Sequence, residues 1–130
     1  MKIFILVVRD DGSHDGTVSM LESYARNYSE SIRLLPSNGE NKGVSGGFAY
    51  LVDYVLNNKE SLGLISAYMM FCDQDDIWYS QKIEKQLALM LATEAANDTE
   101  LPVLVHSDLE VVSEQNLSLI HISEPTRRRG

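Results

Sequence analysis

Residues 3–17 have the sequence IFILVVRDDGSHDGT, and this stretch decides the fold class. Its first six residues form an unbroken apolar run rich in β-branched side chains, which is typical of a strand buried on both faces in a parallel sheet. Gly12 and Gly16 permit tight backbone turns, and Ser13, Asp15 or Thr17 can cap a following helix. The stretch therefore predicts a buried strand, a charged turn and a helix.

The rest of the chain continues this alternation of strands and helices. Apolar residues recur at three- and four-residue spacing in three segments, which predicts helices with one buried face. Short apolar runs between these segments predict further strands. The expected elements are a strand at 3–8, a helix at 18–28, a strand at 32–35, a helix opening within 41–48, a strand at 67–71, a helix at 80–96, a strand at 103–106 and an extended piece at 110–112. This order predicts an α/β domain with a mostly parallel sheet.

A second acidic turn, FCDQDDIW at residues 71–78, follows the expected third strand. Asp73, Asp75 and Asp76 place three carboxylates within four positions, so their mutual repulsion favours a bound cation. Mg²⁺ and Mn²⁺ prefer oxygen ligands, and they bind through one or two carboxylates together with substrate phosphates. The alternative is a solvated turn that caps the next helix, because Asp is also favoured at helix N-termini.

Three polar turns follow strands of the expected sheet, at Asp10-Asp11, at 73–76 and at 106–108. Ligands bind outside the carboxyl ends of parallel strands, so these turns are expected to converge on one edge of the sheet. This convergence favours a metal site over a helix cap.

The glycine-rich segment 41–48 matches neither of the common phosphate-loop spacings. It predicts only a helix N-terminus that a diphosphate or a neighbouring backbone can approach closely. Loop flexibility and helix packing are the alternative explanation of its glycines.

Composition excludes several classes of protein. The formal net charge is −8, and residues 120–130 carry three arginines against one glutamate, so the remainder is more acidic still. Such a chain would be repelled by nucleic acid. Cys72 is the single cysteine of the chain, so neither an internal disulfide nor a thiolate metal site can form, and a reducing compartment is expected. The apolar N-terminal run is too short for a signal sequence or a membrane span.

Four motifs together resemble glycosyltransferase family 2, and within it the rhamnosyltransferase-like enzymes of bacterial cell-surface polysaccharide synthesis. In chain order they are VRDDGSHDGT at 8–17, NKG at 41–43, DQDDIW at 73–78 with Lys82, and HSDL at 106–109. The similarity runs from about residue 3 to residue 117. It implies a truncated GT-A domain, which is a three-layer, Rossmann-like nucleotide-diphospho-sugar transferase fold with a mostly parallel sheet.

The resemblance also implies an activity. This is a metal-dependent, inverting transfer of a sugar, with rhamnose as one candidate, from a dTDP- or UDP-activated donor to a saccharide or lipid-linked saccharide acceptor. Mn²⁺ or Mg²⁺ would neutralise the leaving diphosphate as a Lewis acid. The implied location is the cytoplasm, with peripheral association of the full-length parent at the inner face of the plasma membrane.

Residue roles for the donor follow from the same resemblance. Asp11, with Asp10 beside it, stands where the family places the carboxylate that accepts the N3–H of uracil or thymine. Lys42 and Gly43 are expected near the diphosphate.

The resemblance also assigns the acidic turn. Asp73 and Asp75 form the Asp-x-Asp pair, with Asp75 as the direct metal ligand and Asp73 nearer the ribose or a second side of the metal. Asp76 and Trp78 are expected to shape the turn and the acceptor wall.

An inverting transfer needs a general base that deprotonates the acceptor hydroxyl. Asp108 is the only late candidate, but the base of the family usually lies in an acidic segment further along, for which this chain has no room. The base is therefore expected to be missing, and His106 is expected to be a packed histidine at the end of a strand.

The two ends of the chain depart from the family. Residues 118–130, SLIHISEPTRRRG, resemble translated sequencing-adapter read-through, so we expect a partial catalytic domain at 1–117 and a non-native tail at 118–130, disordered or only incidentally structured. A genuine basic tail that attracts a membrane surface or nucleic acid is the alternative. The strand, turn and helix that family members carry before residue 3 are expected to be absent, which would leave an unpaired sheet edge and an inactive fragment.

Two other functional classes fit parts of the pattern. A phosphoacceptor receiver domain also places acidic residues at strand ends, but it needs a late strand-end lysine, and no lysine follows Lys85. A non-catalytic nucleotide-sugar-binding module stays open beside the enzyme.

Overall fold

The computed structural model describes residues 4–64, 68–97, 100–113 and the backbone of 118–121. The chain divides into two compact units, residues 1–73 and residues 74–130. No helix among the described residues is long and apolar enough to cross a membrane.

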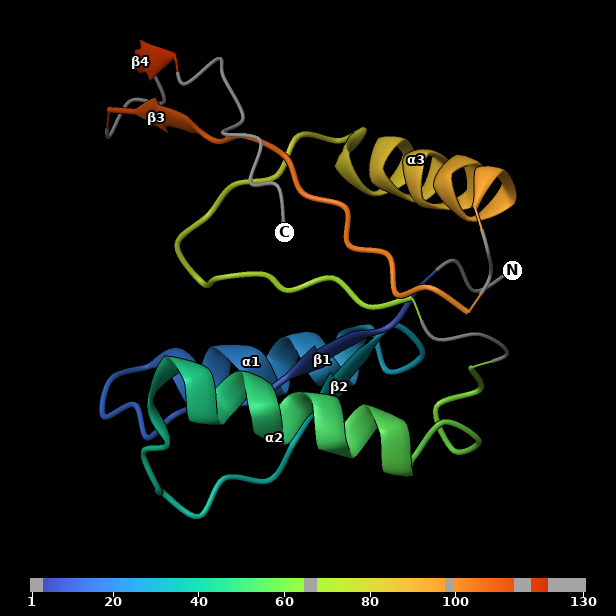
Figure 1. Cartoon of the computed structure of the whole chain (residues 1–130). Coiled ribbons are helices and arrows are strands. Elements are labelled where there is room, and N and C mark those ends of the chain that lie inside the picture. The colour runs from blue at the N-terminus through green and yellow to red at the C-terminus, as the bar shows by residue number, and fades with distance from the viewer. Residues whose placement is uncertain (1–3, 65–67, 98–99, 114–117, 122–130) are drawn as a thin grey trace. The chain divides into compact units, whose positions relative to one another are not determined.

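The first unit has the order β1 (Leu6–Val8), α1 (Thr17–Asn27), β2 (Ile32–Leu34) and α2 (Gly43–Asn57), as Figure 1 shows. The strands pair in parallel, with Leu6 opposite Ile32 and Val8 opposite Leu34. The backbone N–H of Leu35 extends this pairing by donating to the carbonyl of Val8 at 2.9 Å. Helix α1 packs against β2. The first unit is therefore a β–α–β unit followed by a further helix.

Local side-chain contacts fix the start of α1. Oδ1 of Asp15 accepts the backbone N–H of Thr17 at 3.0 Å and its hydroxyl at 2.5 Å. These bonds satisfy a donor that the first turn of a helix leaves without a partner inside the helix. The side chain of Asp15 therefore helps to fix the start of α1 at Thr17, next to the start that the sequence predicted.

The apolar core of the first unit is small. Leu35 and Leu62 are the buried hydrophobic side chains among the described residues, with 2% and 0% of their surface exposed. The rings of Phe48 and Phe71 lie 5.0 Å apart, so α2 contacts the segment that follows it. Several side-chain hydrogen bonds gather at the end of β1 beside this small core.

The second unit contains α3 (Lys82–Ala96), β3 (Glu110–Val112) and β4 (Ser118–His121). The two strands pair antiparallel, with a register irregularity between Val111 and Val112. The side chain of Gln86 on α3 donates to Ser107 Oγ at 2.9 Å, which ties the helix to the segment before β3. Lys82 Nζ lies 4.8 Å from the centre of the Trp78 ring, as a cation–π pair at the start of α3.

Several predictions of the sequence are confirmed. The helices expected at 18–28, within 41–48 and at 80–96 are α1, α2 and α3. The strands expected at 3–8 and 32–35 are the shorter β1 and β2, whose parallel pairing confirms an α/β unit with a small parallel sheet. Residue 3 lies outside the described residues.

The third and fourth parallel strands were predicted wrongly. Residues 68–71 and 103–106 are not strands, and residue 67 lies outside the described residues. Phe71 is 63% exposed and Leu104 is 86% exposed, so neither run is buried between layers of helices. An extended apolar run becomes a strand only where a neighbouring ladder accepts its backbone groups, and the described parallel sheet contains β1 and β2 alone.

The C-terminal segment was expected to be a non-native tail. Its first residues, 118–121, form β4 against β3, and residues 122–130 lie outside the described part of the chain. The extended piece expected at 110–112 is β3. The boundary after residue 117 stays a prediction.

Candidate functional site

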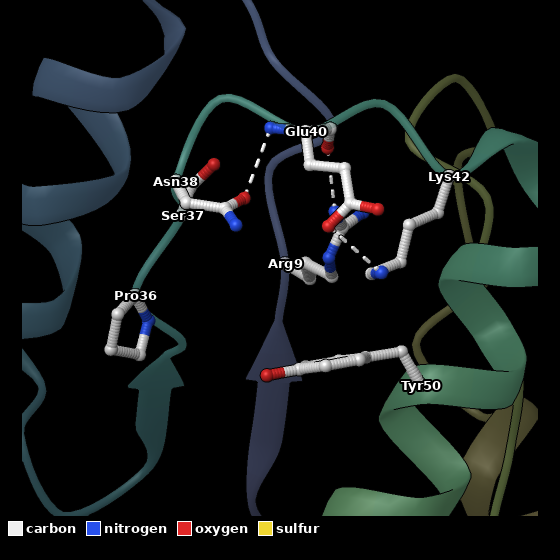
Figure 2. Close-up of a pocket in the computed structure, with 7 residues that line it drawn as sticks. All are labelled: Arg9, Pro36, Ser37, Asn38, Glu40, Lys42 and Tyr50. Atoms are coloured by element: carbon white, nitrogen blue, oxygen red, sulfur yellow. Dashed lines mark hydrogen bonds and ion pairs between the residues drawn. The ribbon is translucent and has the colours of Figure 1, made fainter.

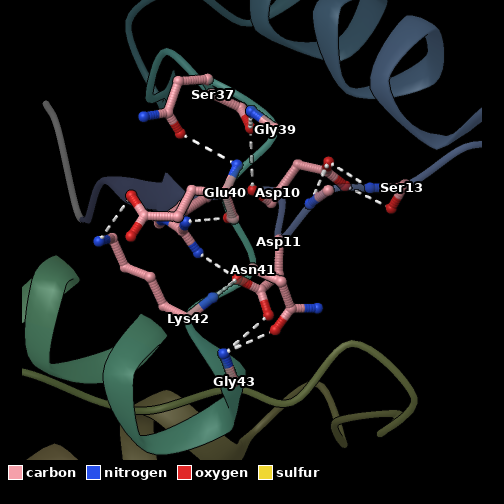
Figure 3. A network of polar contacts seen from close by, with 12 residues as sticks. Asp10, Asp11, Ser13, Ser37, Gly39, Glu40, Asn41, Lys42 and Gly43 are labelled. Carbon is pink, nitrogen blue, oxygen red and sulfur yellow. Dashed lines mark hydrogen bonds and ion pairs between the residues drawn. The ribbon is translucent and has the colours of Figure 1, made fainter.

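The candidate site lies where β1 ends. Val8 is the last strand residue, and Arg9, Asp10 and Asp11 follow it directly. The loop of residues 36–42, which leads from β2 into α2, lies beside this turn (Figure 3). Charged side chains from the turn therefore meet a loop about thirty residues later, as the separations of the hydrogen-bonded pairs show.

Asp10 shapes the turn itself. Its side chain is buried, and the whole residue is only 7% exposed. Oδ2 accepts the backbone N–H groups of Gly12 at 3.1 Å and Ser13 at 2.8 Å, while Oδ1 accepts the Ser13 hydroxyl at 2.5 Å. The Ser13 hydroxyl is the main cause of a lowered pKa of Asp10, against the opposing effect of burial. These contacts give Asp10 a structural task, and its predicted contact with a ligand stays a prediction.

Gly12 allows the 36–42 loop to approach the turn. Its φ of +94° lies in the region that favours glycine. A Cβ atom at this position would lie 3.1 Å from the carbonyl oxygen of Gly39. The Ser37 hydroxyl also donates to the Asp10 carbonyl at 3.3 Å. The turn and the loop are thus in direct backbone contact.

Asp11 joins the turn to the start of α2. Its Oδ1 accepts a hydrogen bond from Arg9 Nη1 at 2.6 Å and one from the backbone N–H of Lys42 at 2.6 Å. Its Oδ2 accepts the backbone N–H of Gly43 at 3.1 Å. The hydrogen bond from Arg9 is the main cause of a lowered pKa of Asp11, so the carboxylate is charged at neutral pH. The positive end of a helix also favours an anion here.

The carboxylate of Asp11 has room for one more donor. A carboxylate offers about four acceptor positions on its two oxygens. Within the described part of the chain, two donors reach Oδ1 and one reaches Oδ2. The remaining position is on Oδ2, so Asp11 can accept one N–H from a ligand without losing its present bonds.

Arg9 and Tyr50 complete the site, and neither was predicted from the sequence as a site residue. The Arg9 side chain is 4% exposed, and its Nη2 donates to the Glu40 carbonyl at 2.7 Å. Its guanidinium carbon lies 5.5 Å from the centre of the Tyr50 ring, and Lys42 Nζ lies 5.4 Å from the same centre. The position of Arg9 directly after a predicted buried strand could have indicated a functional role. No feature of the sequence indicates such a role for Tyr50.

These side chains border a cavity of about 230 Å³, shown in Figure 2. It is lined by Arg9, Pro36, Ser37, Asn38, Glu40, Lys42 and Tyr50. Ligand pockets usually span about 300–1,000 Å³, so this cavity suits one part of a nucleotide-sized ligand. Lys42 Nζ pairs with the Glu40 carboxylate at 3.1 Å, and its side chain keeps 27% of its surface exposed. The cavity therefore has a cation within reach of an incoming anion.

The expected metal ligands lie outside this network. Asp73 ends the first unit and Asp75 belongs to the second, and both are exposed. No group of three His, Cys, Asp or Glu side chains among the described residues is placed to hold a metal ion. Asp73 and Asp75 as metal ligands therefore stay a prediction.

The three polar turns were expected to follow three strands, and the structure contradicts this expectation for two of them. The turns at 73–76 and 106–108 do not follow strands. His106 is exposed, so its expected packing at a strand end was wrong. Asp108, the candidate base, is also exposed, and its catalytic role stays a prediction.

Comparison with known proteins adds evidence independent of this geometry. The family model described as Glycosyl transferase family 2 matches residues 2–110. The chain is similar to dTDP-rhamnosyl transferase RfbG of Shigella flexneri, with 32% identity over 91 residues, which is 69% of this chain and 29% of RfbG. It is also similar to "Putative glycosyltransferase EpsE" of Bacillus subtilis (strain 168), with 28% identity over 85 residues, 65% of this chain and 27% of EpsE.

The matched region thus spans less than a third of the length of each of these relatives. No solved structure gives a significant match to the chain.

Proposed function

Because the chain belongs to glycosyl transferase family 2, we propose that the site at the end of β1 binds the nucleotide of a UDP- or dTDP-activated sugar. One observation carries this proposal, namely the remaining acceptor position on Oδ2 of Asp11. Uracil and thymine carry a donor at N3, which a charged carboxylate accepts well. Cytosine carries an acceptor at the same position and would be rejected.

The diphosphate is assigned to the start of α2. Gly43 is the first residue of this helix, and the dipole of a helix N-terminus attracts phosphate groups. Lys42 Nζ can leave its exposed partner Glu40 for a phosphate, because an ion pair at the surface contributes little.

The metal is assigned to the acidic turn. Asp75, with Asp73, supplies exposed hard oxygen ligands that suit Mn²⁺ or Mg²⁺. When bound, the ion would neutralise charge on the leaving diphosphate. The chain's own groups bind and orient the donor, and Asp108 is the late acidic residue that we propose as a candidate to take the proton of the acceptor hydroxyl.

The reaction is an inverting transfer to a saccharide or lipid-linked saccharide acceptor, within a GT-A domain of which β1, α1, β2 and α2 form part. The name of RfbG specifies dTDP-rhamnose chemistry for that protein, so a dTDP-linked sugar is our first candidate donor. Synthesis of a cell-surface polysaccharide in the bacterial cytoplasm, at the inner face of the membrane, is the proposed setting.

A non-catalytic module that binds nucleotide sugars is the second candidate. The Asp11 network is complete within the first unit, without either Asp75 or Asp108. This arrangement favours nucleotide binding that needs no metal.

Titration calorimetry with UDP or dTDP, with and without Mn²⁺, separates the two candidates. We expect Mn²⁺ to tighten binding by about tenfold or more, because an ion held by Asp75 would offset the negative charge of the diphosphate. Asp75→Ala should abolish this gain and leave the metal-free affinity unchanged. Asp53→Ala removes an exposed carboxylate from α2 and should keep the gain. An affinity of the unmodified chain that Mn²⁺ does not change would overturn the metal-dependent enzyme and favour the binding module.

A further inference from the structure

Arg9 is a charged side chain that the fold buries. Only 4% of its side-chain surface is exposed. Burial of a guanidinium is costly unless the group is paired and hydrogen-bonded. Arg9 meets this condition. Its Nη1 donates a hydrogen bond to the carboxylate of Asp11 at 2.6 Å, and its Nη2 donates one to the carbonyl of Glu40 at 2.7 Å. It therefore bridges the turn after β1 and the 36–42 loop.

We propose that Arg9 is a positioning residue that sets the selectivity of the site for the nucleotide base. It holds Oδ1 of Asp11, so that the free acceptor position of Oδ2 points in one fixed direction. The planar guanidinium has donors in a rigid fork, so Asp11 cannot rotate without breaking the bridge to the loop. This inference rests on the proposed function, because it assumes that Asp11 receives the N3–H of the base.

Tyr50 limits the movement of Arg9. The guanidinium lies over the Tyr50 ring, at a distance typical of cation–π pairs, as Figure 2 shows. Tyr50 comes from α2, so the pair connects the helix to the same bridge. The turn, the loop and the helix thus all contribute to the orientation of one carboxylate.

Selectivity is expected to depend on this rigidity. A fixed carboxylate accepts the N3–H of uracil and rejects cytosine, whose N3 lone pair would face the carboxylate oxygen. If the carboxylate could rotate away, the backbone N–H groups of Lys42 and Gly43 would lose their acceptor and could donate to an acceptor of the base. A loosened site should therefore lose its preference for UDP over CDP and not only its affinity.

The test is titration calorimetry of the full chain with UDP and with CDP. Arg9→Lys keeps the charge but lacks the fork, and we expect the ratio of UDP to CDP affinity to fall by about tenfold, the usual scale of one charge-assisted hydrogen bond. Arg33→Lys is the matched control on the exposed side of β2 and should leave the ratio unchanged. Lys42→Met should weaken both nucleotides alike, because only the Lys42 backbone contacts Asp11.

Each outcome decides the proposal. A folded Arg9→Lys chain with an unchanged ratio overturns the role of Arg9, even where the unmodified chain prefers UDP. If the unmodified chain binds neither nucleotide, the proposed function fails and this inference fails with it. Should Arg9→Lys not fold, Tyr50→Leu decides instead, since Tyr50 is 42% exposed and its loss frees Arg9. A ratio that Tyr50→Leu leaves unchanged would then overturn the proposal.

Discussion

Replacement of Gly12 by alanine is expected to lower the free energy of unfolding by about 1–3 kcal/mol, the usual cost of a non-glycine residue in a sparsely populated backbone region. The φ of +94° is the first cause, and the 3.1 Å approach of a Cβ atom to the Gly39 carbonyl adds to it. With a urea m-value of about 1–3 kcal/mol per M, the midpoint of unfolding should fall by roughly 1 M. Urea titration monitored by circular dichroism measures this change.

Gly16→Ala is the matched control for this substitution. Gly16 has a φ of −75°, and no atom lies within 4 Å of an added Cβ. Alanine fits this position, so the change in unfolding free energy should stay below about 1 kcal/mol. Equal midpoints for the two variants would show that the contact between the turn and the 36–42 loop does not stabilise the first unit.

Replacement of Asp11 by alanine is expected to weaken binding of UDP and dTDP by about 10–100-fold, the usual loss for one or two hydrogen bonds to a charged group. The variant lacks the proposed acceptor for the base. It also leaves the buried Arg9 without its anionic partner, and it frees the N–H groups of Lys42 and Gly43. Titration calorimetry with both nucleotides measures the loss.

Asp53→Ala again serves as the control, because it removes one exposed carboxylate from the same unit and should bind UDP as the unmodified chain does. The urea midpoint of Asp11→Ala needs to be measured beside its affinity, so that unfolding is separated from lost binding. A folded Asp11→Ala chain with unchanged affinity would place the nucleotide elsewhere.

Local sequence patterns were sufficient to predict the elements from β1 to α2. The apolar run before Arg9, the glycines of the turn and the spacing of apolar residues in α1 and α2 all act over a few residues. Such patterns depend on backbone preferences and on one buried face, which the sequence displays directly. The position of Asp10 and Asp11 at the end of a strand follows from them.

The contacts within the site could not be predicted in the same way. Arg9 reaches Glu40 across 31 positions, and this contact depends on the backbone of Gly12 and Gly39 meeting. No periodicity indicates which loop will fold over a turn. The family resemblance predicts Asp11 as a ligand for the base, and this role stays a prediction. The residues that hold Asp11 could not be predicted from the sequence.

The segments at 68–71 and 103–106 show why a strand cannot be predicted from a short apolar run alone. An apolar run of four or five residues has the composition of a buried strand whether or not a neighbouring strand is available. Phe71 and Leu104 are mostly exposed, and the acidic residues that follow lie in irregular backbone. The motif at 73–76 thus identified residue types suited to a metal, while the strand expected to position them did not form.

Amide chemical-shift mapping of the isotope-labelled chain during titration with UDP tests most directly whether the donor nucleotide binds at the end of β1. We expect the largest shifts at Asp11, Lys42 and Gly43, because the N–H groups of Lys42 and Gly43 bind the Asp11 carboxylate that we propose as the acceptor for the base. Residues in the second half of α3 should remain unshifted. Unchanged amides at these three positions under saturating UDP, or largest shifts confined to α3, would contradict the assignment of the donor site.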